Sequence, residues 1–139
     1  MKKAYVTFLT PTHDDDDTYL VEVPDLEILT EGRGLEEAIY MARDAIGIKG
    51  IYMEDEGQNI PEPTSINEVD ESKATYKDVG KSIVTLVDID FYEYRKKVDN
   101  KSVRRNVTIP NWLNKKAEEE NLNVSRVLQE ALMEKLGTS

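Results

Sequence analysis

The sequence predicts an α+β protein built from two modules, a βββαβ unit followed by a strand–helix–helix unit. Two observations lead to this fold class. The spacing of apolar residues changes along the chain from the period of two that is typical of strands to the three-and-four spacing of helices, and back again. The charge also changes sign: residues 1–95 carry 9 basic and 22 acidic side chains, a net charge of −13, whereas residues 96–139 carry 9 basic and 6 acidic ones, a net charge of +3. We therefore expect two domains, residues 1–97 and 98–139, with different partners.

The composition excludes several classes of protein. Of the 139 residues, 39% are hydrophobic and 33% are charged, which fits a globular protein and neither a collagen-like nor a disordered one. No apolar run approaches the roughly 18 residues that span a bilayer, and the first residues do not resemble a signal peptide. The absence of cysteine excludes disulfides, thiolate zinc sites and cysteine nucleophiles. We expect a cytoplasmic protein that contacts no membrane.

Three short strands open the first module, because β-branched and aromatic residues alternate with other residues between turn signals. We expect these strands at Ala4–Leu9, Tyr19–Val23 and Ile28–Glu31. The acidic run Asp14–Asp17 forms the turn after the first strand, and Gly32-Arg33-Gly34 forms the turn from the third strand into a helix.

That helix begins at Leu35, where apolar residues start to recur at intervals of three and four. If the helix includes Gly47 and Gly50, each of them weakens its far end by about 1 kcal/mol relative to alanine. The Pro-containing stretch 60–81 is expected to be a loop with at most short elements. The module closes with a fourth strand, a turn of helix and a linker, at Ser82–Asp88, Asp90–Lys97 and Val98–Lys101.

The second module is predicted to be one strand followed by two helices. Residues Val103–Ile109 alternate, and Pro110 ends this strand at the start of a short helix that extends to Leu122. Ser125 is expected to cap the second helix, and Gly137 to end it. A single strand leaves its own backbone unpaired, so two copies should pair these strands antiparallel as a homodimer, with a two-stranded ribbon over four helices.

This ribbon has the form of a DNA-reading element, since a two-stranded ribbon fits the major groove. Its polar side would present Arg104, Asn106 and Thr108 to base edges, where arginine pairs with guanine and asparagine with adenine. Phosphates would be held by basic side chains and by the amides that begin the second helix, namely Lys101, Arg105, Val124, Ser125 and Arg126. The alternative is an edge strand whose polar side only faces water.

Catalysis and metal binding are not expected. His13 is the only histidine, and the neighbouring Asp14–Asp17 run lacks the spacing of a calcium loop, so we interpret it as a solvated turn. No serine has a histidine base in a motif, and no glycine-rich phosphate loop is present. We therefore predict a protein that is not an enzyme and uses no cofactor or metal. Trp112 is interpreted as a packing residue, and Tyr5, Tyr19 and Tyr40 as core residues or as rim residues of a partner surface.

Four stretches of the sequence resemble the HicB antitoxin family in order and spacing. They are Tyr19-Leu20-Val21-Glu22-Val23-Pro24-Asp25-Leu26, Thr30-Glu31-Gly32, Leu35-Glu36-Glu37-Ala38 and Ile60-Pro61-Glu62-Pro63. Residues 101–137 resemble the ribbon-helix-helix DNA-binding module of some members. The resemblance implies a partial ribonuclease H-like first domain, without an active site, that neutralises a small mRNA-cleaving toxin (HicA-like). It also implies repression of the antitoxin's own operon. Glu27-Ile28-Leu29 departs from the family pattern, and residues 67–81 match none of it.

The charge of the first module agrees with a basic, RNA-binding toxin as partner. The candidate toxin contacts are acidic steering groups, Asp14, Asp15, Asp16, Asp17, Glu22 and Asp25, with Tyr19 as an apolar anchor. A ligand-sensing ribbon-helix-helix repressor without a toxin partner is the alternative function. A residual nuclease would require Asp25, Asp44 and Asp88 to converge on magnesium.

Overall fold

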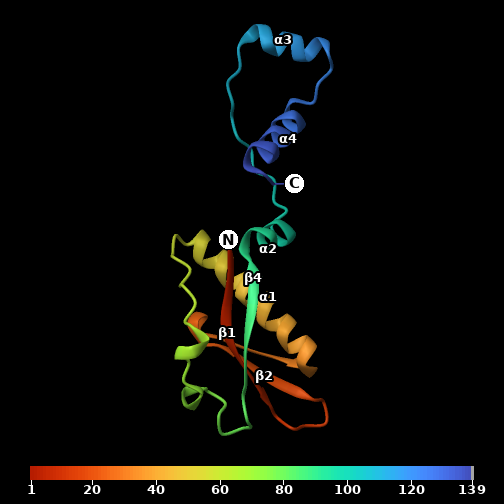
Figure 1. Cartoon of the computed structure of the whole chain (residues 1–139). Helices are drawn as coiled ribbons and strands as arrows, with labels where there is room; N and C mark the ends of the chain where they lie inside the picture. The colour runs from red at the N-terminus through yellow and green to blue at the C-terminus, as the bar shows by residue number, and fades with distance from the viewer. Residues whose placement is uncertain (139) are drawn as a thin grey trace. The chain divides into compact units, whose positions relative to one another are not determined.

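The computed structural model describes residues 1–138 and divides into two compact units. The first unit is Met1–Lys101, and the second begins at Ser102. Figure 1 labels the helices and strands of both units.

A four-stranded antiparallel sheet forms the centre of the first unit. Its strands are β1 (Lys2–Pro11), β2 (Thr18–Val23), β3 (Ile28–Arg33) and β4 (Ile83–Asp90), in the order β3-β2-β1-β4. The central strand β1 is buried continuously over residues 5–10, because both faces of the sheet are covered there. The four expected strands are therefore confirmed, with ends that differ from the expected ones by at most two residues.

The third strand continues further than the sequence predicts. Gly32 and Arg33 pair with β2 instead of forming a turn. Gly32 faces the first helix so closely that a β-carbon on it would lie 2.6 Å from the backbone nitrogen of Ala38. This glycine is therefore a close-packing position, and the change of direction falls on Gly34, whose φ is +75°.

Helix α1 (Gly34–Asp55) covers one face of the sheet, which Figure 1 shows, and buries Ala38, Ala42 and Ile46 against it. The helix continues through Gly47 and Gly50. The expectation that these glycines weaken its far end considers only helix propensity and leaves out the packing against them. Both glycines are buried because aromatic rings of α2 (Phe91–Val98) occupy the space beside them. Asp90 caps α2 by accepting from the amides of Tyr92 and Glu93, at 3.0 and 3.2 Å.

The segment between α1 and β4 lies over the opposite face of the sheet, where Val6 and Phe8 are buried. It is a loop with two short 3-10 turns, η2 (Ile66–Glu68) and η3 (Glu71–Lys73), as expected. A third such turn, η1 (Pro24–Leu26), connects β2 to β3.

The second unit contains α3 (Asn111–Glu119) and α4 (Val124–Leu136). The expected strand at Val103–Ile109 is not formed in the single chain, where no second strand pairs with it. The prediction that Ser125 caps α4 is wrong, because Asn123 accepts from the amide of Arg126 at 3.1 Å and Ser125 lies inside the helix. Gly137 ends α4 with a φ of +69°, as predicted.

Candidate functional site

Over its described residues, the second unit has no buried core of its own. Within the described part of this unit, residues 102–138, no residue is buried, and only Asn114, Ala117 and Leu128 are half-buried. Its apolar side chains instead surround an open groove of about 340 Å³. The lining is entirely apolar and consists of Val107, Ile109, Leu113, Ala117, Leu122, Val124, Val127, Leu128 and Ala131. Trp112, expected to pack, is 72% exposed.

Four of the predicted DNA contacts line one hollow of the second unit. Arg104, Arg105 and Asn106 lie there together with Ser125 of α4, although 19 positions separate Asn106 from Ser125. The other predicted contacts lie elsewhere. Val124 lines the apolar groove, the Nε of Arg126 bonds to Glu130 at 3.2 Å, Thr108 is exposed, and Lys101 belongs to the first unit.

The acidic turn of the first unit is fastened beside the start of α1. Asp14 accepts from the amide of Thr18 at 2.9 Å, and this bond lowers the pKa of the Asp14 carboxyl. The carbonyl oxygen of Asp17 accepts from the amide of Gly34, the first residue of α1, at 2.8 Å. The predicted steering residues Asp14–Asp17 are therefore held in place at one end of α1.

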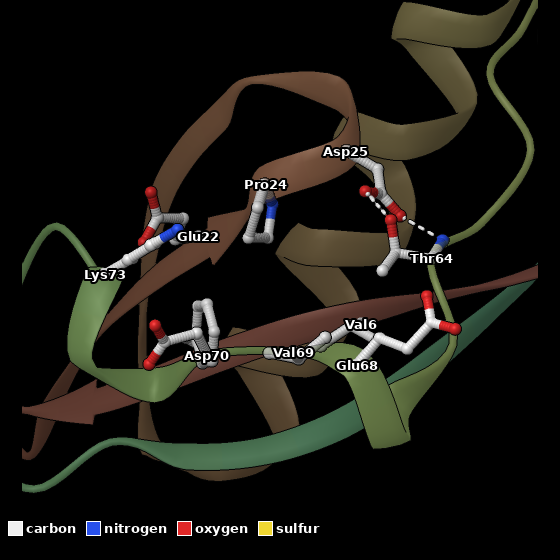
Figure 2. A pocket seen from close by; sticks show the side chains of 10 residues that line it. Val6, Glu22, Pro24, Asp25, Thr64, Glu68, Val69, Asp70 and Lys73 are labelled. Atoms are coloured by element: carbon white, nitrogen blue, oxygen red, sulfur yellow. Dashed lines mark hydrogen bonds between the residues drawn. The ribbon is translucent and has the colours of Figure 1, made fainter.

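Glu22 and Asp25, also predicted to face a toxin, bind the protein's own loop. The carboxylate of Asp25 accepts from both the amide and the hydroxyl of Thr64, each at 2.7 Å (Figure 2). The carboxylate of Glu22 accepts in the same way from Thr75, at 2.9 and 2.6 Å. These two carboxylate–threonine clamps fix both ends of residues 64–75 to the sheet unit.

Between the clamps lies a hollow of about 240 Å³. Figure 2 shows its walls, which are formed by η1 and β2 on one side and by the loop residues on the other. The floor includes Val6 and Phe8, and the rim carries Glu68, Asp70 and Lys73. The clamps therefore enclose a small groove with an apolar floor and a mostly acidic rim.

The tyrosines interpreted as core or rim divide between the two roles. Tyr5 is fully buried, and its hydroxyl donates to the carbonyl of Pro61 at 2.7 Å. Burial, with smaller contributions from Glu62 and Asp25, raises the pKa of Tyr5 to about 12. Tyr19 is half-buried and packs against the core, whereas Tyr40 is 57% exposed.

The comparison with known proteins now identifies the family. The profile of the HicB-like antitoxins of bacterial toxin–antitoxin systems matches residues 5–131. The chain belongs to this family. A HicB-like antitoxin is not an enzyme, and the acidic groups described above are accordingly interpreted as binding or structural groups.

Two solved structures are similar to this HicB-like antitoxin. A chain of a toxin–antitoxin complex from Streptococcus pneumoniae is 29% identical, with 97% of this chain and 99% of that chain covered and a TM-score of 0.57. The antitoxin HicB from Burkholderia pseudomallei is 23% identical, with 97% of both chains covered and a TM-score of 0.52, and shares the fold. No curated protein matches the chain.

The residual-nuclease interpretation finds no geometric support in this antitoxin. Asp25 bonds to Thr64, Asp44 accepts from the Tyr94 hydroxyl, and Asp88 pairs with Arg43, so the three carboxylates occupy separate places. Among residues 1–138, no three histidine or carboxylate side chains are grouped so that they could hold a metal ion. In the same residues, no helix is both long enough and apolar enough to cross a bilayer.

Sequence reasoning named only Tyr40 of one surface of the antitoxin, the outer face of α1. Tyr40, Ile48 and Tyr52 are 57%, 56% and 56% exposed there. The only signal in the sequence is that Tyr40, Ile48 and Tyr52 fall outside the stripe of Ala38, Ala42 and Ile46, and this signal can be used only once the side of the helix that meets the sheet is known.

Proposed function

We propose that this antitoxin neutralises a HicA-like mRNA-cleaving ribonuclease with its first unit and represses its own operon by binding promoter DNA with its second unit. The observation that carries this proposal is the division of the chain into two compact units of different character. Residues 1–101 carry 12 basic and 23 acidic side chains, a net charge of −11, whereas residues 102–139 carry 6 basic and 5 acidic ones, a net charge of +1.

The acidic first unit suits a basic toxin. Charge complementarity raises the rate of encounter and makes the protein more selective for its partner, although it contributes less to the final affinity. The solved neighbour from a toxin–antitoxin complex supports a toxin as the partner. Asp14, Asp15, Asp16 and Asp17 are the proposed steering groups, with Tyr19 beside them, while Glu22 and Asp25 act mainly by holding the loop.

The second unit requires a second copy of the chain to bury its apolar groove. Eleven large apolar side chains of residues 102–138 are at least 38% exposed, among them Val107, Ile109 and Leu113. A unit without a buried core gains too little from burial to offset the loss of conformational entropy. Antiparallel pairing of two Val103–Ile109 segments would supply both a backbone ladder and a shared core, and this is the proposed homodimer.

The dimer would present the DNA contacts. Arg104, Asn106 and Thr108 are proposed to read bases, and Arg105, Val124, Ser125 and Arg126 to contact phosphate. Lys101 lies just outside the compact second unit and would add a further phosphate contact. The nearly neutral charge of residues 102–139 means that base contacts and the α4 amides must contribute much of the affinity.

The test uses the product of the reading frame next to the antitoxin gene as the toxin. The purified product should cleave RNA alone and stop cleaving when the full-length antitoxin is added in equal amount. The antitoxin should sediment as a dimer at micromolar concentration and retard DNA from upstream of its own gene. Unimpeded RNA cleavage in the mixture contradicts the toxin assignment, and a monomer contradicts the ribbon.

A further inference from the structure

Helix α1 has apolar side chains where a surface helix normally has polar ones. Its inner side buries Ala38, Ala42 and Ile46 against the sheet. Its outer side carries Tyr40, Ile48 and Tyr52, and because four residues exceed one turn by about 40°, the three form a stripe that winds through about 120° along the exposed side of the helix. Large apolar side chains that are exposed on the side of a helix away from its sheet often mark a surface that a partner covers.

The exposed face is rigidly supported. The hydroxyl of Tyr94 donates to Asp44, between Tyr40 and Ile48, at 2.8 Å. On the side of the helix toward β4, the guanidinium of Arg43 donates to the carbonyl and the carboxylate of Asp88, at 3.0 and 3.1 Å. A partner that binds a preformed surface does not have to order it, and this favours a tight complex.

Acidic groups lie at both ends of this apolar face. At its start are Glu36 and Glu37, with the acidic turn fastened to Gly34. At its end are Glu54, Asp55 and Glu56, of which Glu54 and Asp55 are paired with Arg95 at 3.1 and 3.0 Å. An apolar aromatic centre with a charged rim is the usual anatomy of a protein interface.

We infer that the toxin docks across the outer face of α1, with Tyr40, Ile48 and Tyr52 at the centre of the interface and the flanking carboxylates around it. The matching toxin surface has an apolar centre and basic side chains at its edge. This inference rests on the proposed toxin partner and names the surface that holds it. The acidic turn Asp14–Asp17, which is bonded to the start of α1, then lies at the rim of this interface.

The test measures the affinity of full-length variants for the product of the neighbouring reading frame. Tyr40→Ala, Tyr52→Ala and Ile48→Asp should each weaken binding by about tenfold or more, as expected for central interface residues. Tyr52→Phe should bind nearly as well as the wild type, because the ring and not the hydroxyl is proposed to fill the interface. DNA retardation and sedimentation should be unchanged in all four variants.

Two matched controls lie outside the proposed surface. Tyr92→Ala removes a tyrosine of α2 that is 72% exposed, and Leu86→Asp places a charge on the sheet face opposite α1, where Leu86 is 48% exposed and pairs with Val6. Both should bind the toxin within about twofold of the wild type. A thermal unfolding scan of each variant separates lost binding from lost folding, and Tyr52→Phe provides a folded comparison at the same position.

The outcomes separate the inference from the proposed function. Tight binding by the wild type together with unchanged binding by the α1 variants overturns the α1 surface and leaves the toxin partner standing. A wild type that does not bind overturns both. A change in sedimentation of the α1 variants would mean that a second copy of the chain covers this face, which also overturns the inference.

Discussion

The ring of Tyr94 lies against Gly47, so closely that a β-carbon on Gly47 would come within 2.7 Å of three ring atoms. Phe91 lies against Gly50 in the same way, three residues further along α1. The two glycines thus let α2 pack directly onto the backbone of α1. A feature that weakens the helix in isolation stabilises the first unit as a whole.

Gly47→Ala should therefore destabilise the protein. Alanine favours an isolated helix by about 1 kcal/mol, but the added methyl group forces the Tyr94 ring away, and overpacking of this kind costs about 1–3 kcal/mol. Chemical denaturation of the full chain measures the net change in the free energy of unfolding. Lys49→Ala, two residues along the same helix, is the control and should change this free energy by less than about 0.5 kcal/mol. A more stable Gly47→Ala variant would mean that α2 does not pack here.

The two carboxylate–threonine clamps should hold residues 64–75 in place. Thr64→Val and Thr75→Val keep the shape of the side chain and remove one hydroxyl donor each, with an expected loss of about 0.5–1.5 kcal/mol. Amide hydrogen exchange should rise across residues 64–75 in both variants and stay unchanged in α1. Glu68→Ala, on the rim of the same hollow, is the control. If Asp25→Ala and Thr64→Val each reduce stability and their losses simply add in the double variant, the two residues do not interact.

Stability should fall at high pH because of two tyrosines. Burial raises the pKa of Tyr5 to about 12, and burial together with the hydrogen bond to Asp44 raises the pKa of Tyr94 to about 12. In the unfolded chain both phenols lose their proton near pH 10, so the unfolded state releases protons that the folded state keeps. The stabilisation is fully present below pH 10 and is lost as the pH rises from about 10 to about 12.

An absorbance titration of tyrosinate measures this effect directly. Two of the seven tyrosines, Tyr5 and Tyr94, should ionise with a pKa of about 12 while the protein stays folded. Tyr94→Phe should remove one of these late steps and leave the other. Ionisation of all seven tyrosines near pH 10 in a folded sample would contradict the burial of Tyr5.

The DNA contacts should divide into two kinds. Arg104→Ala should cost about 1–3 kcal/mol at the preferred site and relax the sequence preference there, because it removes a base contact. Lys101→Ala should weaken binding to all sequences alike and reduce the salt dependence, because it removes a phosphate contact. Competition binding between operator and unrelated DNA at several salt concentrations distinguishes these results. An Arg104→Ala variant that loses affinity equally for every sequence would make Arg104 a phosphate contact.

Local patterns predicted the strands and the long helix of the first unit, and contacts between distant residues set the rest. Alternating residues identified β1 and β2, and the change to three-and-four spacing placed the start of α1 within one residue. The far end of α1 was not predictable, because the rings that pack on Gly47 and Gly50 come from residues more than 40 positions later. The clamps of Asp25 and Glu22 join residues 39 and 53 positions apart and leave no local signal.

The capping of α4 shows a different limit of prediction from sequence. The stretch Asn123-Val124-Ser125 offers two good capping residues within three positions, and sequence alone does not choose between them. The choice depends on which side-chain oxygen reaches a free amide, and this is Asn123 to Arg126. The exposed face of α1 was missed because it can be recognised only when the side that meets the sheet is known.

One measurement tests most directly whether the first unit neutralises the toxin independently of DNA binding by the second unit. It is RNA cleavage by the neighbouring toxin in the presence of full-length Val107→Asp antitoxin, whose charge falls in the apolar groove of the second unit. We predict that this variant sediments as a monomer and no longer retards promoter DNA, yet still protects RNA because the first unit is intact. Loss of RNA protection to the same extent as loss of DNA binding, in a variant whose first unit remains folded, would contradict the account.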